Sequence, residues 1–179
     1  MRRRVRAPDV SADPSEISEP LRPDSDVAAF ACGSANLDEY LVTRAMSDQR
    51  AHKSRTYVAV EGTRVVGYYT LAAAGVEPEQ ATARARKGQG DQPVPAILLA
   101  RLAVDADHQG CGLGEALLLE ALRRSVTASE TIGARVVLVH AADARARTFY
   151  QRYGFEAAPT SPLHLMLLMK DVRATLGDG

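Results

Sequence analysis

The chain has 179 residues, 46% of them hydrophobic, which is enough for one compact domain with an apolar core. Its 22 Lys and Arg residues balance 22 Asp and Glu residues, so net charge gives no overall attraction to nucleic acid. No apolar run approaches the ~20 residues of a membrane span, the basic start leads into no secretory h-region, and two cysteines make no disulfide framework. We therefore expect a reduced, cytoplasmic globular protein without a membrane partner.

The first half of the chain changes character near Asp26. Residues 1–25 are rich in Pro, Ser and acidic side chains, and we expect them to form a disordered tail. The apolar spacing after them predicts a helix from Asn36 to about Arg50, with Asn36 as its N-cap. The β-branched stretches 56–60 and 65–71, joined by the turn Glu61-Gly62-Thr63, predict a hairpin.

The second half alternates buried strands with helices. Residues 77–92 are polar and predict a loop with room for a short helix. The remaining predictions are strands at 96–104, 136–139 and 165–169, and helices at 115–125 and 143–153, the last ended by Gly154. Antiparallel strands followed by a β-α-β-α-β order predict an α/β (α+β) fold, with helices packed on a mixed sheet in a single domain over residues 26–176.

The stretch HQGCGLGE at 108–115 carries three glycines between an apolar strand and an apolar helix. It lacks the Lys of a Walker A loop, and Glu115 stands where a dinucleotide-binding fingerprint needs its third glycine. A strand, a glycine turn and a helix N-terminus nevertheless favour an anion, because backbone N–H groups and the helix dipole point to one place. A tight turn without a ligand remains the alternative.

Two motifs resemble one family. Gln109–Gly114 is similar to the Q/R-x-x-G-x-G/A motif of the GCN5-related N-acetyltransferases (GNAT), and residues 143–155 resemble their N-x-x-A-x-x-x-Y-x-x-x-G-F signature. Asp143 departs from it, because the family usually has Asn there. The resemblance covers about residues 26–170. It implies the GNAT fold, a mixed, mostly antiparallel central sheet with a splayed central strand, flanked by helices.

The resemblance also implies a site for acetyl-CoA as acetyl donor, with no metal. The pantetheine arm would pair with the backbone of the central strand, and the pyrophosphate would meet the glycine loop. Asp143 and Arg147 would add cofactor contacts, and Tyr150 would be the general acid, with packing on the sheet as its alternative role. The implied cofactor-binding residues of the strand and the loop are Leu102, Ala103, Val104, Gln109, Gly110, Cys111, Gly112, Leu113 and Gly114.

The acceptor amine must be neutral to attack. An α-amine, with a pKa near ~7.7–8.0, needs less help from a base than a lysine side chain near ~10.4. His140, at the end of a buried strand, is the one candidate base, and packing at the strand end is its alternative role. The weak evidence for a base favours an α-amine acceptor.

The N-terminal half resembles a subgroup of the same family. The N-terminal stretches 30–33, 36–41, 55–58 and 65–71, together with 93–95 and 98–105, are similar to those of acetyltransferase toxins from type II toxin–antitoxin systems. That resemblance implies acetylation of the α-amine of aminoacyl-tRNA, which blocks translation. It further implies an adjacently encoded ribbon–helix–helix antitoxin, operator DNA bound only through that antitoxin, and a homodimer.

A tRNA substrate requires positive charge, because affinity for nucleic acid depends on phosphate contacts. Basic residues cluster at 44–64, 84–87 and 145–152, and each cluster alone is also typical of a solvated surface. Two alternatives stay open: a small-molecule or protein N-terminal acetyltransferase, and a non-catalytic acyl-CoA-binding module. The candidate tRNA contacts are Arg44, Arg50, Lys53, Arg55 and Arg86.

Overall fold

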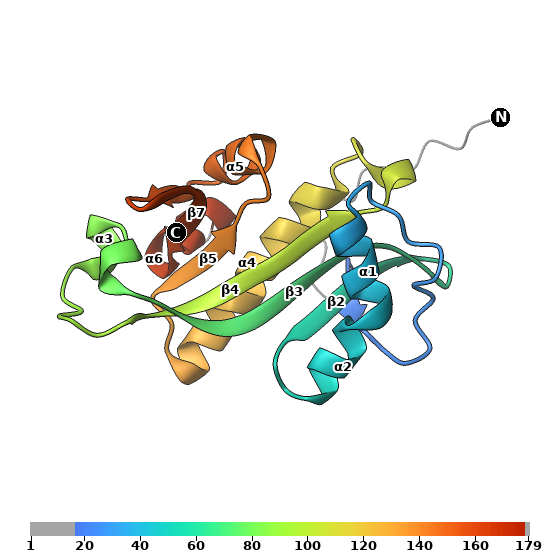
Figure 1. The fold of residues 1–179 in the computed structure, drawn as a ribbon, viewed down its shortest axis with the longest axis horizontal. Coiled ribbons are helices and arrows are strands. Elements are labelled where there is room, and N and C mark those ends of the chain that lie inside the picture. The colour runs from blue at the N-terminus through green and yellow to red at the C-terminus, as the bar shows by residue number, and fades with distance from the viewer. Residues whose placement is uncertain (1–16, 178–179) are drawn as a thin grey trace. The chain divides into compact units, whose positions relative to one another are not determined.

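A computed structural model describes residues 17–177 of the chain, which form six α-helices and seven strands (Figure 1). The strands are β1 (Glu19–Pro20), β2 (Arg55–Glu61), β3 (Arg64–Val76), β4 (Val94–Val104), β5 (Val136–His140), β6 (Glu156–Ala158) and β7 (Ser161–Leu168). The α-helices are α1 (Ala35–Thr43), α2 (Ala45–Arg50), α3 (Ala83–Arg86), α4 (Leu113–Ile132), α5 (Ala144–Gln151) and α6 (Met169–Leu176).

The strands form one sheet in the order β1-β2-β3-β4-β5-β7-β6. The β4–β5 pair is parallel, and the β1–β2, β2–β3, β5–β7 and β6–β7 pairs are antiparallel. This mixed, mostly antiparallel sheet confirms the predicted fold class. The backbone divides into two compact units. The first contains the described residues up to Leu71 together with Arg101–Ala121, and the second contains Ala72–Ala100 together with the described residues from Leu122 onward.

The β2–β3 hairpin organises the first unit, and its registration from Arg55↔Leu71 to Glu61↔Arg64 confirms the prediction. Successive side chains of β3 point to opposite faces. Tyr68 packs toward α1, where its hydroxyl donates to the Leu37 carbonyl, and Tyr69 donates to Glu120 of α4. Gly67 lets α4 approach this strand, because a Cβ there would lie 2.8 Å from Leu117 Cδ1.

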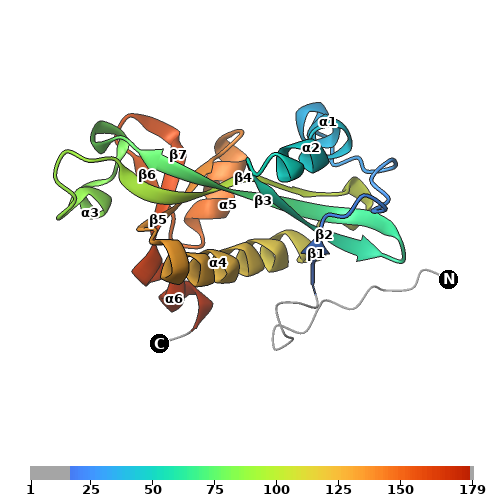
Figure 2. The same ribbon diagram turned by 90° about the horizontal axis from the view of Figure 1, so that it is seen from below.

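The predicted helix over 36–50 is wrong in two details. The structure has two helices, α1 and α2, which are separated at Arg44 with φ −123°. Thr43 Oγ1 donates to the Glu39 carbonyl 2.7 Å away, a local bond of a kind that competes with a continuing helix. The residue at the N-cap of α1 is Ser34 rather than Asn36. Figure 2 shows α1 and α2 side by side near β2.

The predicted N-terminal tail extends too far. Residues 1–16 lie outside the described residues, but β1 pairs with β2 through Glu19↔Val58 and Pro20↔Tyr57. Ser18 donates to the buried carboxylate of Glu120 at 2.7 Å, and Leu21 is buried in the core of this unit. The polar, proline-containing composition of this segment gives no signal for a strand. The structure nevertheless has a short edge strand there, which a tertiary contact holds in place.

The second unit is built around β5, whose four valine and leucine residues are buried. Strand β5 pairs with β4 from Ala96↔Val136 to Leu99↔Val139 and with β7 from Val136↔Leu168 to His140↔His164. Helices α5 and α6 pack against β7. The sequence did not predict β6 or α6, and α4 continues seven residues beyond its predicted end at Ser125. Gly154 has φ +89°, as expected for the residue that ends the helical stretch before it.

Candidate active site

The glycine loop leads from β4 into α4 within the first unit. Gly110 and Gly112 have φ values of +75° and +88°, which L side chains rarely adopt. A Cβ at either position would meet nothing within 4 Å, so backbone conformation rather than crowding requires glycine there. The Ala116 N–H bonds to the Gly112 carbonyl, so the N–H groups before it belong to the first turn and have no intrahelical acceptor. This loop can therefore bind an anion.

Gly114 differs from these two glycines. Its φ is not positive, and a Cβ there would make only an ordinary contact of 3.7 Å with Val104 Cγ2. The folded chain itself therefore does not require glycine at this position. Gly114 leaves this position of the first turn of α4 without a side chain, which agrees with the Gly-or-Ala position of the acetyltransferase motif.

The end of β4 supplies backbone groups beside this loop. The parallel ladder between β4 and β5 has its last pair at Leu99↔Val139, and β4 continues to Val104. The strand end is fixed by the Asp105 N–H, which donates to the Val66 carbonyl at 2.9 Å. Leu102, Ala103 and Val104, the predicted pantetheine-binding residues, therefore belong to a section of β4 beyond the β4–β5 ladder.

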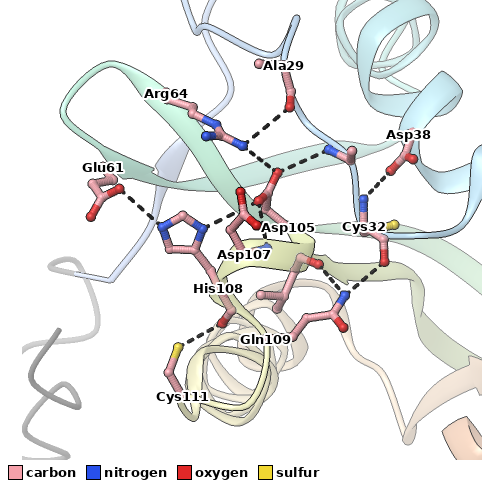
Figure 3. A network of polar contacts seen from close by, with 12 residues as sticks. Ala29, Cys32, Asp38, Glu61, Arg64, Asp105, Asp107, His108, Gln109 and Cys111 are labelled. Atoms are coloured by element: carbon pink, nitrogen blue, oxygen red, sulfur yellow. Dashed lines mark hydrogen bonds and ion pairs between the residues drawn. The ribbon is translucent and has the colours of Figure 1, made fainter. Parts of the chain in front are cut away.

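Asp105 is the centre of a polar network that the sequence did not reveal (Figure 3). Its side chain is 2% exposed and accepts from the Ala31 N–H, the Asp107 N–H and Arg64 Nη2 at 3.0–3.2 Å. Burial favours the neutral carboxyl, but these donors outweigh it and hold the pKa of Asp105 below its ordinary value. The network ties the loop start to the segment before α1.

His108 and Gln109 extend this network to the loop itself (Figure 3). His108 Nε2 lies 3.2 Å from Glu61 Oε2, while its Nδ1 lies 3.5 Å from Asp105 Oδ1. Gln109 Nε2 donates to the carbonyls of Cys32 and Val104, both at 2.9 Å. The Gln109 side chain thus fixes the loop conformation, and only its backbone N–H is left to serve a ligand as the resemblance implies.

Tyr150 lies on α5 in the second unit, and its ring packs edge-on against Phe149 and Phe155 at centroid distances of 5.2 and 5.5 Å. Its side chain is buried, yet its hydroxyl makes no hydrogen bond with any residue in the range 17–177. Burial raises the pKa of Tyr150 to about 12, so the hydroxyl is protonated at neutral pH. Packing holds the ring, and the hydroxyl is left to donate.

Asp143 and Arg147 stand on the first turns of the same helix. Asp143 Oδ1 caps α5 by accepting the Ala146 N–H at 2.8 Å, a structural role that the sequence motif did not indicate. Arg147 Nε is buried and has no hydrogen-bond partner among the described residues. An orphaned buried donor of this kind fits an anionic ligand such as a cofactor phosphate.

His140 is paired across strands with His164, and the two rings stack with centroids 4.2 Å apart. Partial burial and the charge of His164 lower the pKa of His140 below its ordinary value. The imidazole is therefore neutral at physiological pH and carries a lone pair. The geometry accounts for the packing role of His140.

The predicted basic residues are not equally available. Arg50, Arg55 and Arg86 are exposed, and the ion pairs of Arg44 and Lys53 with Asp48 are long, at 3.9 and 3.7 Å. Arg64 forms an ion pair with Asp105, and Arg84 forms ion pairs with Glu156 and Asp171. The basic clusters around residues 44–64 and 84–87 are thus smaller than the sequence indicated, because folding pairs some of their charges internally.

Two other kinds of feature are absent from residues 17–177. Within residues 17–177, no group of three or more His, Cys, Asp and Glu side chains is arranged to hold a metal ion. None of the helices in that range is long and apolar enough to cross a membrane.

Comparison with known proteins identifies the kind of domain. Residues 52–157 match the acetyltransferase (GNAT) domain family. The chain is 50% identical over 153 residues to the tRNA-acetylating toxin of Mycobacterium tuberculosis (strain ATCC 25618 / H37Rv), a match that covers 86% of this chain and 92% of that protein. It is 31% identical over 175 residues to the probable toxin TacT of Sinorhizobium fredii (strain NBRC 101917 / NGR234), covering 90% and 95% of the two chains.

Solved structures of AtaT are also similar to this chain in fold. AtaT complexed with acetyl-methionyl-tRNAfMet matches with a TM-score of 0.81 at 27% identity, over 88% of this chain and 96% of AtaT. A tyrosine-to-phenylalanine variant of AtaT bound to acetyl-CoA and the C-terminus of the antitoxin AtaR matches with a TM-score of 0.75 at 28% identity, over 88% and 95%. The AtaT–AtaR complex bound to DNA matches with a TM-score of 0.70 at 28% identity, over 88% and 97%.

Proposed function

The chain belongs to the GNAT family of acetyltransferases, and from this premise we propose that it is the toxin of a toxin–antitoxin pair. It transfers the acetyl group of acetyl-CoA to the α-amine of the amino acid on charged tRNA. The product has no free amine for peptide-bond formation, so translation stops. The observation that carries this proposal is the 50% identity, over nearly the whole chain, to a tRNA-acetylating toxin.

The donor is held by the first unit. The N–H groups of residues 109–114 bind the pyrophosphate, which the positive φ values of Gly110 and Gly112 and the open first turn of α4 support. The backbone of Leu102, Ala103 and Val104 pairs with the pantetheine arm in the manner of an added strand. In the second unit, Arg147 offers its unpaired Nε to a phosphate, and Asp143 acts on the cofactor through the helix start that it caps.

Tyr150 is the general acid. As the bond between carbonyl carbon and sulfur breaks, its phenol donates a proton to the departing thiolate. A phenol with a pKa of about 12 is a weak acid, so this transfer must accompany bond cleavage rather than precede it. The acceptor amine loses one proton and the thiolate gains one, so the reaction consumes no protons overall.

The acceptor is an α-amine, whose pKa near ~7.7–8.0 leaves a large neutral fraction without a strong base. Arg44, Arg50, Lys53, Arg55 and Arg86 are the side chains that we assign to the phosphates of the tRNA. The two long ion pairs of Asp48 leave Arg44 and Lys53 free to exchange that partner for phosphate.

The same proposal extends to partners and location. The protein acts in the cytoplasm, where charged tRNA and acetyl-CoA are found, and forms a homodimer. Its antitoxin is a ribbon–helix–helix protein encoded next to it, and the pair contacts operator DNA through the antitoxin. The structural match to the AtaT–AtaR complex bound to DNA supports this arrangement.

The deciding experiment incubates the purified protein with acetyl-CoA and a pool of charged tRNAs, followed by mass spectrometry of the aminoacyl esters. We expect acetylated aminoacyl esters with the wild-type protein and a strongly reduced yield with Tyr150→Phe. The charge reversals Arg50→Glu and Lys53→Glu should weaken turnover of charged tRNA while acetyl-CoA affinity is unchanged. Acetyl transfer to small amines or to protein N-termini, with none to charged tRNA, would refute the proposal.

A further inference from the structure

Arg101 is a positively charged side chain with no ion-pair partner among residues 17–177. It lies in β4 immediately before Leu102, and it is partly buried. Its guanidinium makes no hydrogen bond and no ion pair with any residue of the described range 17–177. A charge that is partly removed from water without a counter-charge is unfavourable, so such a group in a folded protein indicates an anionic ligand.

Tyr40 fixes the position of this guanidinium. The Arg101 Cζ atom lies 3.4 Å from the centroid of the Tyr40 ring, so the planar group rests on the ring face. Tyr40 is itself held, because it is 3% exposed and its hydroxyl lies 3.3 Å from Ser54 Oγ. Stacking uses the face of the guanidinium and leaves its in-plane N–H donors free, the geometry that suits two oxygens of a phosphate.

Arg44 brings a second cation to the same ring. Its Cζ atom lies 5.8 Å from the Tyr40 centroid, and its side chain is 64% exposed. The carboxylate nearest to it is Asp48, at 3.9 Å, which also lies 3.7 Å from Lys53. The carboxylate of Asp48 is thus shared between two cations at long range, and Arg101 adds another positive charge at the Tyr40 ring.

The position of Arg101 along β4 relates it to the acetyl group. Under the proposed function, the pyrophosphate lies at residues 109–114 and the pantetheine arm runs back along β4 from Val104 to Leu102. The thioester at the end of that arm then arrives on the Arg101 side of Leu102. The acceptor amine must meet the thioester there, and the nearest tRNA phosphate, on O5′ of the terminal nucleotide, lies about eight bonds from that amine.

We propose that Arg101 and Arg44, held against the Tyr40 ring, form the binding site for a backbone phosphate at the 3′ end of charged tRNA. The inference rests on the proposed function and names the group that recognises its substrate. Tyr40 is too deeply buried to stack on a base, so the site binds phosphate and carries no base specificity.

The experiment compares two acceptors, charged tRNA and an aminoacyl ester without phosphate, using Arg101→Met, Arg101→Lys and Arg44→Met. Arg101→Met keeps an unbranched apolar stem over Tyr40 and removes the charge. Arg173→Met, which removes an equal charge that is paired with Glu130 at 2.9 Å, is the matched control. The readouts are KM and kcat for each acceptor, acetyl-CoA affinity, thermal unfolding and the salt dependence of kcat/KM.

We expect Arg101→Met to raise KM for charged tRNA about tenfold or more, since a hydrogen-bonded charge is lost, and to leave turnover of the phosphate-free ester within about twofold. The salt dependence of kcat/KM for charged tRNA should become shallower by about 0.7–0.9 per lost phosphate contact. Arg101→Lys should recover part of the loss, because it restores the charge but not the planar fork. The effects of Arg44→Met and Arg101→Met should be non-additive if both contact one phosphate.

Equal losses with both acceptors would overturn the inference, because Arg101 would then act on the thioester or on the shape of β4. Unchanged kinetics with weaker antitoxin binding would also overturn it and assign the cations to a protein carboxylate. If Arg101→Met lowers the melting temperature strongly, Arg44→Met tests the same site, because it leaves the Arg101 side chain stacked on the Tyr40 ring. Failure of the wild-type protein to acetylate charged tRNA overturns both proposals, whereas an Arg101→Met variant as active as wild type overturns only this one.

Discussion

The candidate groups of the first unit are backbone N–H groups in a glycine loop, and a polar network centred on the buried Asp105 and extended by His108 and Gln109 fixes their positions (Figure 3). The candidate group of the second unit is the hydroxyl of one side chain, Tyr150, and ring packing against Phe149 and Phe155 fixes it. Several aligned backbone N–H dipoles can bind an extended anion, because a fixed loop holds them in one orientation. Proton donation requires one group with no competing partner, which apolar packing provides without hydrogen bonds.

The largest expected effect comes from the second unit. Tyr150→Phe removes the proton donor and keeps the ring in its aromatic contacts, so kcat should fall by about 10²–10⁴-fold, the range of general acid catalysis. Acetyl-CoA affinity and the melting temperature should stay near wild-type values. A single-turnover assay with charged tRNA measures the rate. An equal fall in acetyl-CoA affinity would assign Tyr150 to donor binding instead.

The next effect tests the backbone role of the loop. Gly112→Ala places a Cβ on a residue with φ +88°, which costs about 1–2 kcal/mol or shifts the loop. Acetyl-CoA affinity, measured by calorimetry, should therefore fall about tenfold. Cys111→Ala is the control, because it removes the Sγ contact to the His108 carbonyl and keeps the backbone N–H. A similar loss in both variants would mean that side chains of the loop matter as much as its backbone.

A smaller effect is expected on stability when the polar network is broken. Asp105→Asn leaves Arg64 without its counter-charge and should lower the free energy of unfolding by about 2 kcal/mol. Because the pKa of Asp105 is lowered by folding, its stabilisation is present above about pH 4 and is lost as pH falls through the folded value. Urea unfolding at several pH values should therefore show a flatter acid limb for the variant. Glu130→Gln, in an exposed ion pair, should change stability by less than about 0.5 kcal/mol.

The smallest effect concerns the stacked histidines of the second unit. The pKa of His140 is lowered in the folded protein, so the unfolded chain takes up a proton first as pH falls. Wild-type stability is thus complete above about pH 6.5 and declines as pH falls through the lowered pKa of folded His140, and His140→Gln should remove part of that decline. In the acetylation assay at about pH 8, where an α-amine needs no strong base, the variant should keep most of its activity. A loss of more than tenfold there would make His140 the general base.

Local patterns predicted much of the fold, because they depend on neighbours in the chain. The hairpin at Glu61–Arg64, the glycine loop and the strand of β5 all follow from spacing, turn residues and β-branched runs. The two motifs placed the chain in its family, and the domain match bears that out. The β1 strand and the interruption at Arg44 were missed, since composition favours a tail in one case and apolar spacing continues through the other.

The sequence by itself therefore determined the family, the glycine loop and the identity of Tyr150 as the candidate acid. Only the tertiary structure decided which charges remain available for a substrate. Arg64 and Arg84 are neutralised by carboxylates 41 and 72 or more positions away. Arg101, which looks like a break in an apolar strand, is instead stacked on Tyr40 and has no ion-pair partner among residues 17–177. The reason is physical. A carboxylate close in space neutralises a basic side chain, and folding decides which residues distant in the sequence become such neighbours.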